Sequence, residues 1–346
     1  MQSPIGGPRF WRRLVSRWLH PARRMQREWN ERAQTDPQGY IGRGYAGSDA
    51  QFWASGAPDL DGLILDGLEL DRRATVLEIG CGVGRLLRPL AARAHRVIGV
   101  DIAPAMIEQG RTLLADLPRV SLHVTHGRLD AVGEASLDLV YSFAVFQHIP
   151  SKRAIAQYVS EAARTLRAGG VFKFQVDGRR RPFWRGTDTW LGVWYTPEEI
   201  RRVLADRGFT VADAWGAETQ YYWITAVRQS AAGRPATDLV RVRSNSWNRT
   251  ALAALLTRLG HDPAAALPEI TADGRPLRDF VRHFLDEHRH HSPEAFVTAA
   301  FQVLFNRAPD ADGLAFYTTE LRRGGSRAYL LDCLLASAEL RRALRE

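Results

Sequence analysis

The chain has 346 residues, of which 45% are hydrophobic and 25% are charged, as is typical of a globular protein. Its net charge of +9 at pH 7 raises the question of nucleic-acid binding, but all except two of its 47 basic residues are arginines scattered along the chain. That pattern favours a compositional bias over a polyanion-binding surface. Two distant cysteines, Cys81 and Cys333, indicate a reducing compartment and not a disulfide framework. No apolar run reaches the roughly 18 residues of a membrane span, and arginines interrupt the N-terminal apolar residues, so neither a span nor a secretory signal is expected.

Residues 1–50 are predicted to form two N-terminal amphipathic helices and a loop. In residues 9–20 the apolar side chains share one face and arginines the other, so this helix can lie on an anionic membrane surface or pack against protein. A second helix is expected at residues 24–33, and a loop rich in glycine and tyrosine follows it, able to fold over a ligand. We therefore place the chain in the cytoplasm, with residues 9–20 as the candidate peripheral contact with the inner membrane face.

Residues 51–228 alternate between strands and helices. Seven strands are predicted, at residues 76–79, 97–101, 120–124, 139–143, 171–176, 209–211 and 221–227. Gly169 and Gly170 are expected to end the helix before the fifth strand, and Thr196 to cap the helix before the sixth. The alternation predicts an α/β fold with a doubly wound, mostly parallel seven-stranded sheet, whose ligands lie at the carboxyl ends of the strands. The N-terminal helices precede this sheet and a small all-α domain follows it.

A glycine-rich turn follows the first strand. Gly80, Gly82 and Gly84 alternate there, as expected where a backbone approaches a ligand closely and takes positive φ. The second strand ends in Asp101, a position from which a carboxylate can reach a ribose diol. Glu78 lies inside the first strand, where a buried carboxylate needs a partner such as a cationic or hydrogen-bond-donating ligand. The turn alone would also fit a protein that binds NAD or FAD.

Two further segments narrow the interpretation. The fourth strand leads into Phe146-Gln147-His148, and Leu166-Arg167-Ala168-Gly169-Gly170 precedes the fifth strand. With the glycine turn, these motifs make residues 53–228 resemble the seven-stranded, class I methyltransferases that use S-adenosylmethionine. The resemblance implies that the cofactor is bound by Glu78, Gly80, Cys81, Gly82, Gly84, Asp101, Ile102, Leu129, Asp130 and Ser142. Residues 126–130 match the third ligand loop of this family, in which an acid usually follows the glycine and receives the adenine amine. Arg128 replaces that acid here, so either Asp130 takes its place or backbone groups alone hold the adenine.

The acceptor side of such a reaction needs other residues. A hydroxyl that receives a methyl group must lose its proton, and His148 is the candidate base; the alternative is a histidine that fixes its loop by hydrogen bonding. The candidate substrate-binding residues are Arg179, Arg181, Trp184 and Trp190, which suit an anionic or sugar-like acceptor. The alternative is a solvated loop whose tryptophans plug the domain edge. Nucleic acid is not expected as the acceptor, because the sequence typical of enzymes that methylate base amines is absent after the fourth strand.

The rest of the chain changes character. Residues 229–275 are predicted to be a linker with one helix at residues 250–259, and residues 276–346 a helical domain with four helices. A cluster of four histidines, within residues 283–291, lacks a second spaced group of ligands, so a solvated helix end is expected there and no metal site. The segments 306–313, 316–317 and 337–339 make residues 292–346 resemble a helical domain of unknown function found in bacterial surface-layer and glycan-related proteins.

These features lead to one predicted function and two alternatives. The predicted function is methyl transfer from S-adenosylmethionine to oxygen on a sugar-containing or small acidic acceptor, a small molecule or glycan linked to cell-surface glycan synthesis. One alternative is a methyltransferase-like scaffold in a glycan-assembly complex, with the C-terminal domain docking a partner protein. The other is an RNA or protein methyltransferase, which the arginine-rich loop after the fifth strand favours.

Overall fold

The computed structural model describes residues 21–41, 48–181, 188–230, 236–243, 246–271 and 275–345. The candidate membrane-contacting segment at residues 9–20, residues 42–47 of the glycine-rich loop, and Trp184 lie outside these described residues. Within them, no helix is long and apolar enough to span a membrane.

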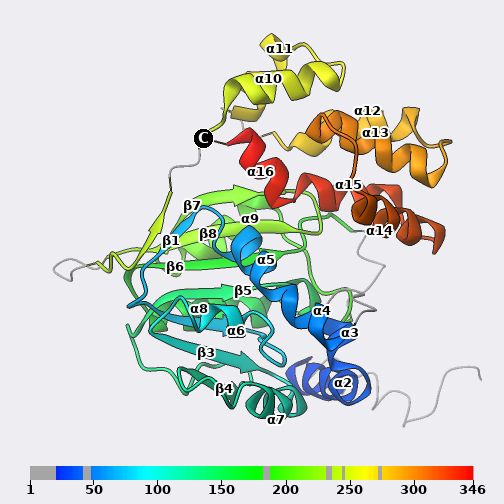
Figure 1. Ribbon diagram of the computed structural model, residues 1–346. Helices are drawn as coiled ribbons and strands as arrows, with labels where there is room; N and C mark the ends of the chain where they lie inside the picture. The colour runs from blue at the N-terminus through cyan, green and yellow to red at the C-terminus, as the bar shows by residue number, and fades with distance from the viewer. Residues whose placement is uncertain are drawn as a thin grey trace, which may run out of the picture.

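A seven-stranded sheet forms the centre of the molecule (Figure 1). Its strands lie in the order β4-β3-β2-β5-β6-β8-β7, and β8 is antiparallel to both of its neighbours while the other pairs are parallel. The predicted doubly wound, mostly parallel sheet is therefore confirmed. The strands are β2 (Thr75–Ile79), β3 (Arg96–Asp101), β4 (Val120–Val124), β5 (Leu137–Ser142), β6 (Leu166–Val176), β7 (Phe209–Trp215) and β8 (Tyr222–Arg228).

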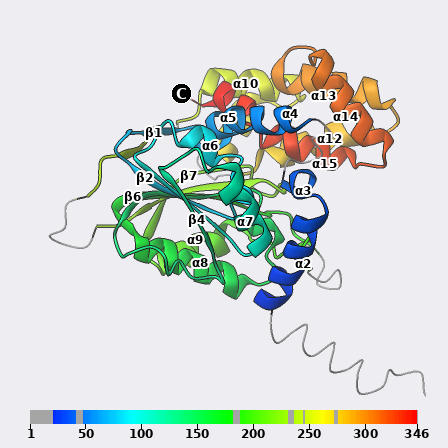
Figure 2. The same cartoon turned by 60° about the horizontal axis from the view of Figure 1, so that its bottom comes forward.

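Helices cover both faces of the sheet, because alternate residues of a strand point to opposite sides. In β2, Leu77 and Ile79 belong to one buried apolar cluster and Val76 belongs to another. Helix α2 packs beside α7 at one edge (Figure 2). The helices of this part are α2 (Pro21–Thr35), α3 (Pro37–Ile41), α4 (Asp49–Ala54), α5 (Gly56–Asp59), the π-helix η1 (Leu60–Ile64), α6 (Leu87–Leu90), α7 (Pro104–Leu113), the 3₁₀-helix η2 (Phe146–His148), α8 (Lys152–Thr165) and α9 (Pro197–Ala205).

Local signals were right at one helix boundary and wrong at another. Thr196 caps α9 as predicted, accepting a hydrogen bond from the N–H of Glu199, whose carboxylate accepts one from the N–H of Thr196. The predicted glycine stop is wrong: α8 ends at Thr165 and β6 begins at the next residue. Gly169, with φ of 76°, lies instead in a bulge of β6, where the register with β5 shifts. Residues 37–41, expected in a loop, form the short helix α3.

The C-terminal helices lie beyond the β7 edge of the sheet (Figure 1). They share an apolar core that includes Leu252, Phe296 and Leu334, and Trp215 of β7 joins that core. Residues 229–275 contain more than the single predicted helix: α11 follows α10, and β9 pairs antiparallel with β1. These elements are β1 (Leu68–Leu70), β9 (Val240–Val242), α10 (Arg249–Arg258), α11 (Pro263–Thr271), α12 (Leu277–Glu287), α13 (Pro293–Phe305), α14 (Ala311–Arg322), α15 (Arg327–Leu335) and α16 (Ala338–Leu344).

Candidate active site

A cavity of about 720 Å³ opens at the carboxyl ends of the strands. The strand order reverses between β2 and β5, and ligands of open α/β sheets bind at such a switch point. Gly80, Gly82, Asp101 and Ile102 line one end of the cavity, as the cofactor prediction requires. The volume falls within the range of about 300–1,000 Å³ typical of small-molecule sites.

The glycine turn is held tightly against the protein on its inner side. The N–H groups of Gly80 and Cys81 both donate to the carbonyl oxygen of Val100, at 2.7 and 3.1 Å. Gly80 has a φ of 77°, and a Cβ there would collide with the side chain of Val145. A side chain at this position would therefore be strained by both backbone conformation and lack of space.

The Asp101 carboxylate is fixed beside this turn. One oxygen accepts a hydrogen bond from the N–H of Gly82 and the other from the N–H of Ala103, each at 2.9 Å. Burial raises the pKa of Asp101, and the two N–H donors oppose that rise. A carboxylate oxygen has two lone pairs, so each oxygen can accept one further hydrogen bond from a ligand.

Glu78 lies beneath the turn, and the residues assigned to the cavity wall do not include it. Its side chain is buried and accepts a hydrogen bond of 3.0 Å from the Tyr141 hydroxyl, so its partner is a side chain of the protein itself and not the ligand that the sequence suggested. Burial raises the pKa of Glu78 to about 8. Any effect of Glu78 on a ligand must therefore pass through the turn above it.

Replacement of Glu78 by glutamine is expected to remove part of the pH dependence of stability. Because the pKa of Glu78 is raised from 4.5 to about 8, the folded protein binds more protons than the unfolded chain between these values, and its stability falls as the pH rises through this window. The Glu78→Gln variant should match the wild type near pH 5 and exceed it at pH 8, as measured by urea unfolding. Exposed Glu134→Gln is the control; parallel curves for the Glu78 variant and the wild type would refute the prediction.

The third ligand loop differs from its prediction. Thr125 and Tyr158 line the cavity, although neither was singled out from the sequence. Thr125 follows directly after β4, and that position at a strand end was the available signal. The N–H of Leu129 donates to the Glu161 carboxylate at 2.8 Å, and exposed Asp130 pairs with Arg128 at 3.0 Å.

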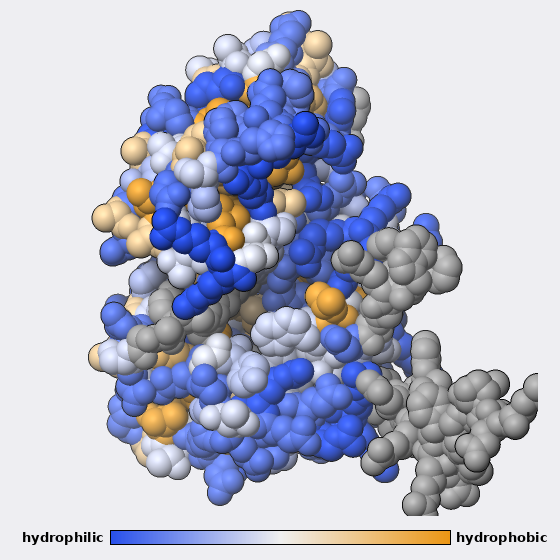
Figure 3. Space-filling model, turned by 90° about the vertical axis from the view of Figure 1, so that its right-hand side faces the viewer, coloured by the Kyte–Doolittle hydropathy of each residue, from blue (hydrophilic) through white to orange (hydrophobic). Residues whose placement is uncertain are grey.

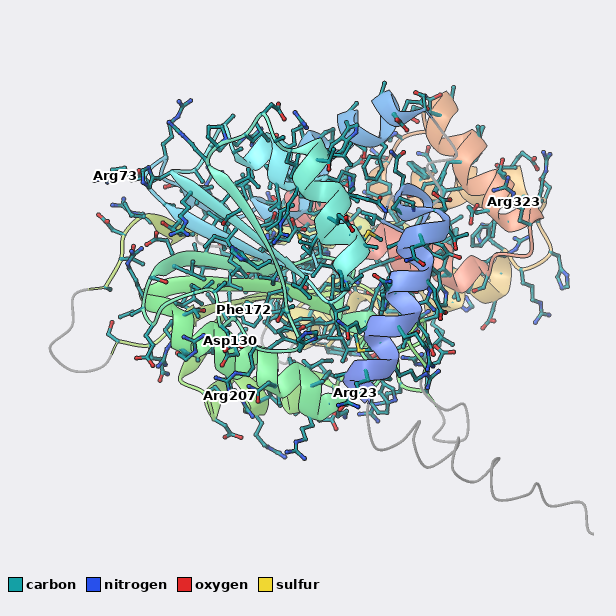
Figure 4. The ribbon with its side chains drawn as sticks, turned by 90° about the horizontal axis from the view of Figure 1, so that it is seen from below. Arg23, Arg73, Asp130, Phe172, Arg207 and Arg323 are labelled. Atoms are coloured by element: carbon teal, nitrogen blue, oxygen red, sulfur yellow. The ribbon has the colours of Figure 1, made fainter. Side chains whose placement is uncertain are left out.

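Figure 4 shows Asp130 on the opposite side of the view from Arg323 of the C-terminal domain. Among the described residues, the cavity wall includes none of Cys81, Gly84, Leu129, Asp130 and Ser142. The Ser142 hydroxyl instead donates to the Ile79 carbonyl oxygen, which ties β5 to the end of β2.

His148 lies on the cavity wall, within a hydrogen-bond chain whose direction is set at both ends. At one end the N–H of Ala144 donates to Oε1 of Gln175, so Nε2 of Gln175 must donate to Oε1 of Gln147. Nε2 of Gln147 then donates to Nε2 of His148, 3.0 Å away. At the other end Nδ1 of His148 lies 2.7 Å from the Trp190 carbonyl oxygen, which can only accept. The chain therefore assigns the proton of a neutral imidazole to Nδ1 and leaves Nε2 as the acceptor.

The predicted substrate arginines are engaged by the protein itself. Both Arg179 and Arg181 pair with the buried Asp177 carboxylate, at 3.0 and 3.1 Å. Arg179 lines the cavity; Arg181 is not among the wall residues and donates to the Gly192 carbonyl oxygen. Trp190 lines the cavity with half of its surface exposed. Two arginines on one carboxylate leave a net charge of +1 in this group.

The histidine-rich helix end is engaged in contacts with its own helix. The His288 ring stacks on Phe284, and its Nδ1 lies 3.0 Å from the Phe284 carbonyl oxygen. His283 lies beside Glu287, at 3.1 Å. No group of three or more metal-ligating side chains occurs in the part of the chain that the structure describes.

Comparison with known proteins agrees with this geometry. Residues 76–170 match the family model of a methyltransferase domain. This match and the seven-stranded sheet both support the predicted class I methyltransferase fold. The C-terminal residues 282–343 match a domain of unknown function (DUF4214), as the sequence motifs predicted.

Individual relatives of the methyltransferase domain cover only part of each chain. A protein of Mycolicibacterium smegmatis named probable S-adenosylmethionine-dependent methyltransferase is 39% identical over 147 residues, 41% of this chain and 54% of that protein. The ubiquinone biosynthesis O-methyltransferase of a Methylobacterium strain is 33% identical over 159 residues, 41% of this chain and 62% of that protein. A solved phosphoethanolamine N-methyltransferase of Haemonchus contortus has 18% identity and a TM-score of 0.48, over 63% of this chain and 51% of that one. The chain thus spans about half to three fifths of the length of these relatives.

Proposed function

We propose that the chain is an S-adenosylmethionine-dependent methyltransferase that acts on a hydroxyl of a sugar-containing or small acidic acceptor in cell-surface glycan synthesis. The observation that carries the cofactor is the Asp101 carboxylate, fixed on the cavity wall beside the glycine turn with one lone pair left on each oxygen. These two acceptor oxygens fit the two hydroxyl donors of a ribose, and apolar Ile102 beside them fits an adenine ring. When bound, the cofactor supplies an electrophilic methyl group on sulfur.

The hydroxyl acceptor is supported by the state of His148. A neutral imidazole whose Nε2 accepts hydrogen bonds can receive a proton there. An acceptor hydroxyl that replaces the Gln147 amide as the donor would deliver its proton to this atom as its oxygen takes the methyl group. The similarity to ubiquinone biosynthesis O-methyltransferases supports transfer to oxygen.

Two residues of the cavity wall support the sugar-containing or acidic character of the acceptor. Arg179 and exposed Trp190 on the cavity wall offer a cation and a flat ring, which suit an acid and a sugar face. The match to DUF4214 supports the link to surface glycans by association alone. The rival proposal, a scaffold whose C-terminal domain docks a partner protein, predicts cofactor binding without turnover.

The proposed location is the cytoplasm, with peripheral contact with the inner membrane face through residues 9–20. Cys81 and Cys333 form no disulfide, which agrees with a reducing compartment. The membrane contact stays a prediction from the sequence.

Replacement of Asp101 by alanine tests the cofactor proposal. Each hydrogen bond to a charged group contributes about 1.5–3 kcal/mol, so the affinity for S-adenosylhomocysteine should fall at least about 10- to 100-fold, as measured by calorimetry. Asp130→Ala is the matched control, because that carboxylate is exposed and lies off the cavity wall. Wild-type affinity of the Asp101 variant, or no binding by the wild type, would refute the proposal.

A further inference from the structure

The C-terminal helices form a wall of the same cavity that the glycine turn lines. The residues that they contribute include Tyr317, Glu320, Leu321, Tyr329, Cys333 and Ala338, from α14, α15 and the start of α16. These helices belong to the domain of unknown function, and their wall residues lie more than 200 positions from the glycine turn in the sequence. The cavity is therefore composed of both parts of the chain.

The sheet order separates this wall from the cofactor end. Gly80 and Thr125 follow β2 and β4, and Asp101 ends β3, on one side of the switch point. On the other side, Phe143 follows β5 and Arg179 follows β6. Strands β6 and β8 lie on the side of the sheet nearer to the C-terminal helices (Figure 1), whose side chains line the cavity together with Phe143 and Arg179.

Aromatic side chains form the junction between the two walls. The Tyr221 hydroxyl, from the start of the β8 region, lies 2.8 Å from the Tyr329 hydroxyl of α15. The Phe143 ring stacks on Trp223, with centroids 5.6 Å apart and an interplanar angle of 17°. Both pairs line the cavity. Flat apolar faces beside hydroxyl groups suit a ligand that is itself a ring with hydroxyl substituents.

The cavity also carries an apolar rim. Six large hydrophobic side chains are exposed among the described residues, and four of them, Tyr40, Trp190, Leu191 and Phe316, line this cavity. Figure 3 shows that hydrophobic residues on one face of the molecule lie in small patches among hydrophilic ones. Clustering of exposed apolar residues at one opening is typical of a ligand entrance and not of scattered surface residues.

Buried ion pairs hold the C-terminal wall in place. Arg341 of α16 donates to the Asp66 carboxylate and, at 2.8 Å, to the Asp213 carboxylate of β7. Arg278 of α12 pairs with buried Asp332 of α15 at 2.8 Å. The C-terminal helices are thus fixed against the sheet with charges that would be costly to separate.

We infer that the C-terminal helical domain forms the acceptor half of the active site, and that the acceptor is a hydroxylated ring held against the aromatic side chains of Tyr221, Trp223 and Tyr329 on the cavity wall. The inference rests on the proposed methyltransferase function. A sugar ring and a phenol share this chemistry, and the two arms of the test distinguish them. In this arrangement the C-terminal domain selects the acceptor that binds in the cavity. It does not serve as a separate domain that docks a partner protein.

The test places a large side chain in the acceptor half of the cavity and leaves the residues of the cofactor half unchanged. Cys333→Phe adds a large side chain to the wall on α15, and Ala343→Phe adds the same side chain at an exposed position of α16. Each full-length variant is assayed for binding of S-adenosylhomocysteine and for transfer of labelled methyl groups to two panels. One panel contains methyl glycosides and uronic acids; the other contains catechol and hydroxycinnamic acids.

The expected result is a rise in KM for the methylated compound of at least 10-fold in Cys333→Phe, with Kd for S-adenosylhomocysteine within twofold of the wild type in both variants. Tyr329→Phe, which keeps the ring and removes one hydroxyl, should also raise KM for the acceptor and leave Kd for S-adenosylhomocysteine unchanged. This second variant keeps the inference testable if Cys333→Phe does not fold. An unchanged KM in both cavity variants, or wild-type cofactor binding with no methylation in either panel, overturns the inference. No cofactor binding by the wild type overturns the proposed function, and the inference with it.

Discussion

Replacement of His148 by alanine is expected to lower the rate of methyl transfer about 100- to 10,000-fold, which is the usual contribution of a general base. The directed hydrogen-bond chain through Gln175 and Gln147 keeps Nε2 of His148 as an acceptor on the cavity wall. Alanine removes that acceptor. Single-turnover rates across pH 5–9, with an acceptor that the wild type methylates, measure the effect.

The control separates this role from the structural alternative. Nδ1 of His148 donates to the Trp190 carbonyl oxygen, so the histidine also fixes its loop. His148→Gln can keep that hydrogen bond while removing the base, and His95→Ala reports on the loss of an exposed histidine that is not on the cavity wall. If the alanine variant retains the wild-type rate at every pH, the structural role alone is correct.

Replacement of Arg341 by methionine is expected to lower the free energy of unfolding by about 3–5 kcal/mol, the usual result of removing one partner of a buried ion pair. The variant leaves the Asp66 and Asp213 carboxylates without their shared guanidinium. Arg341 is only 8% exposed, so water cannot replace it fully. Urea unfolding measures the change.

The neighbouring Arg342 provides the matched control. It lies on the exposed face of α16, so Arg342→Met should change stability by less than about 0.5 kcal/mol. If the two substitutions lower the free energy of unfolding equally, the ion pairs of Arg341 contribute no more to stability than the positive charge of an exposed arginine does. A selective effect of Arg341→Met that also raises the acceptor KM would tie the fixed position of the C-terminal helices to acceptor binding.

The sheet and the cofactor end of the cavity could be predicted because their signals are local. The apolar run before Gly80 and the acid at Asp101 each identify a strand end within a few residues of sequence. Parallel strands place those ends at one edge, so the meeting of Gly82 and Asp101 followed from topology. By contrast, the loop containing Asp130 was assigned by analogy, and the structure places that carboxylate off the cavity wall.

The cavity wall formed by the C-terminal helices could not be predicted, because it depends on contacts between segments that are distant in the sequence. Nothing near Tyr329 indicates that it meets Tyr221, 108 positions away. One available signal was overlooked: Lys173, Asp213 and Asp332 interrupt otherwise apolar segments, and buried charges need partners. The same reasoning, applied to Glu78 alone, did identify a buried group with a partner.

The contact between Asp66 and Arg341 joins residues 275 positions apart. Closing so long a loop is entropically costly and slow relative to forming the sheet from neighbouring strand–helix units. During refolding, the parallel strands and the glycine turn can therefore form before the C-terminal helices reach their place. The acceptor half of the cavity would then be the last part of the protein to reach its native structure. The refolding protein would regain cofactor binding before it regains methyl transfer.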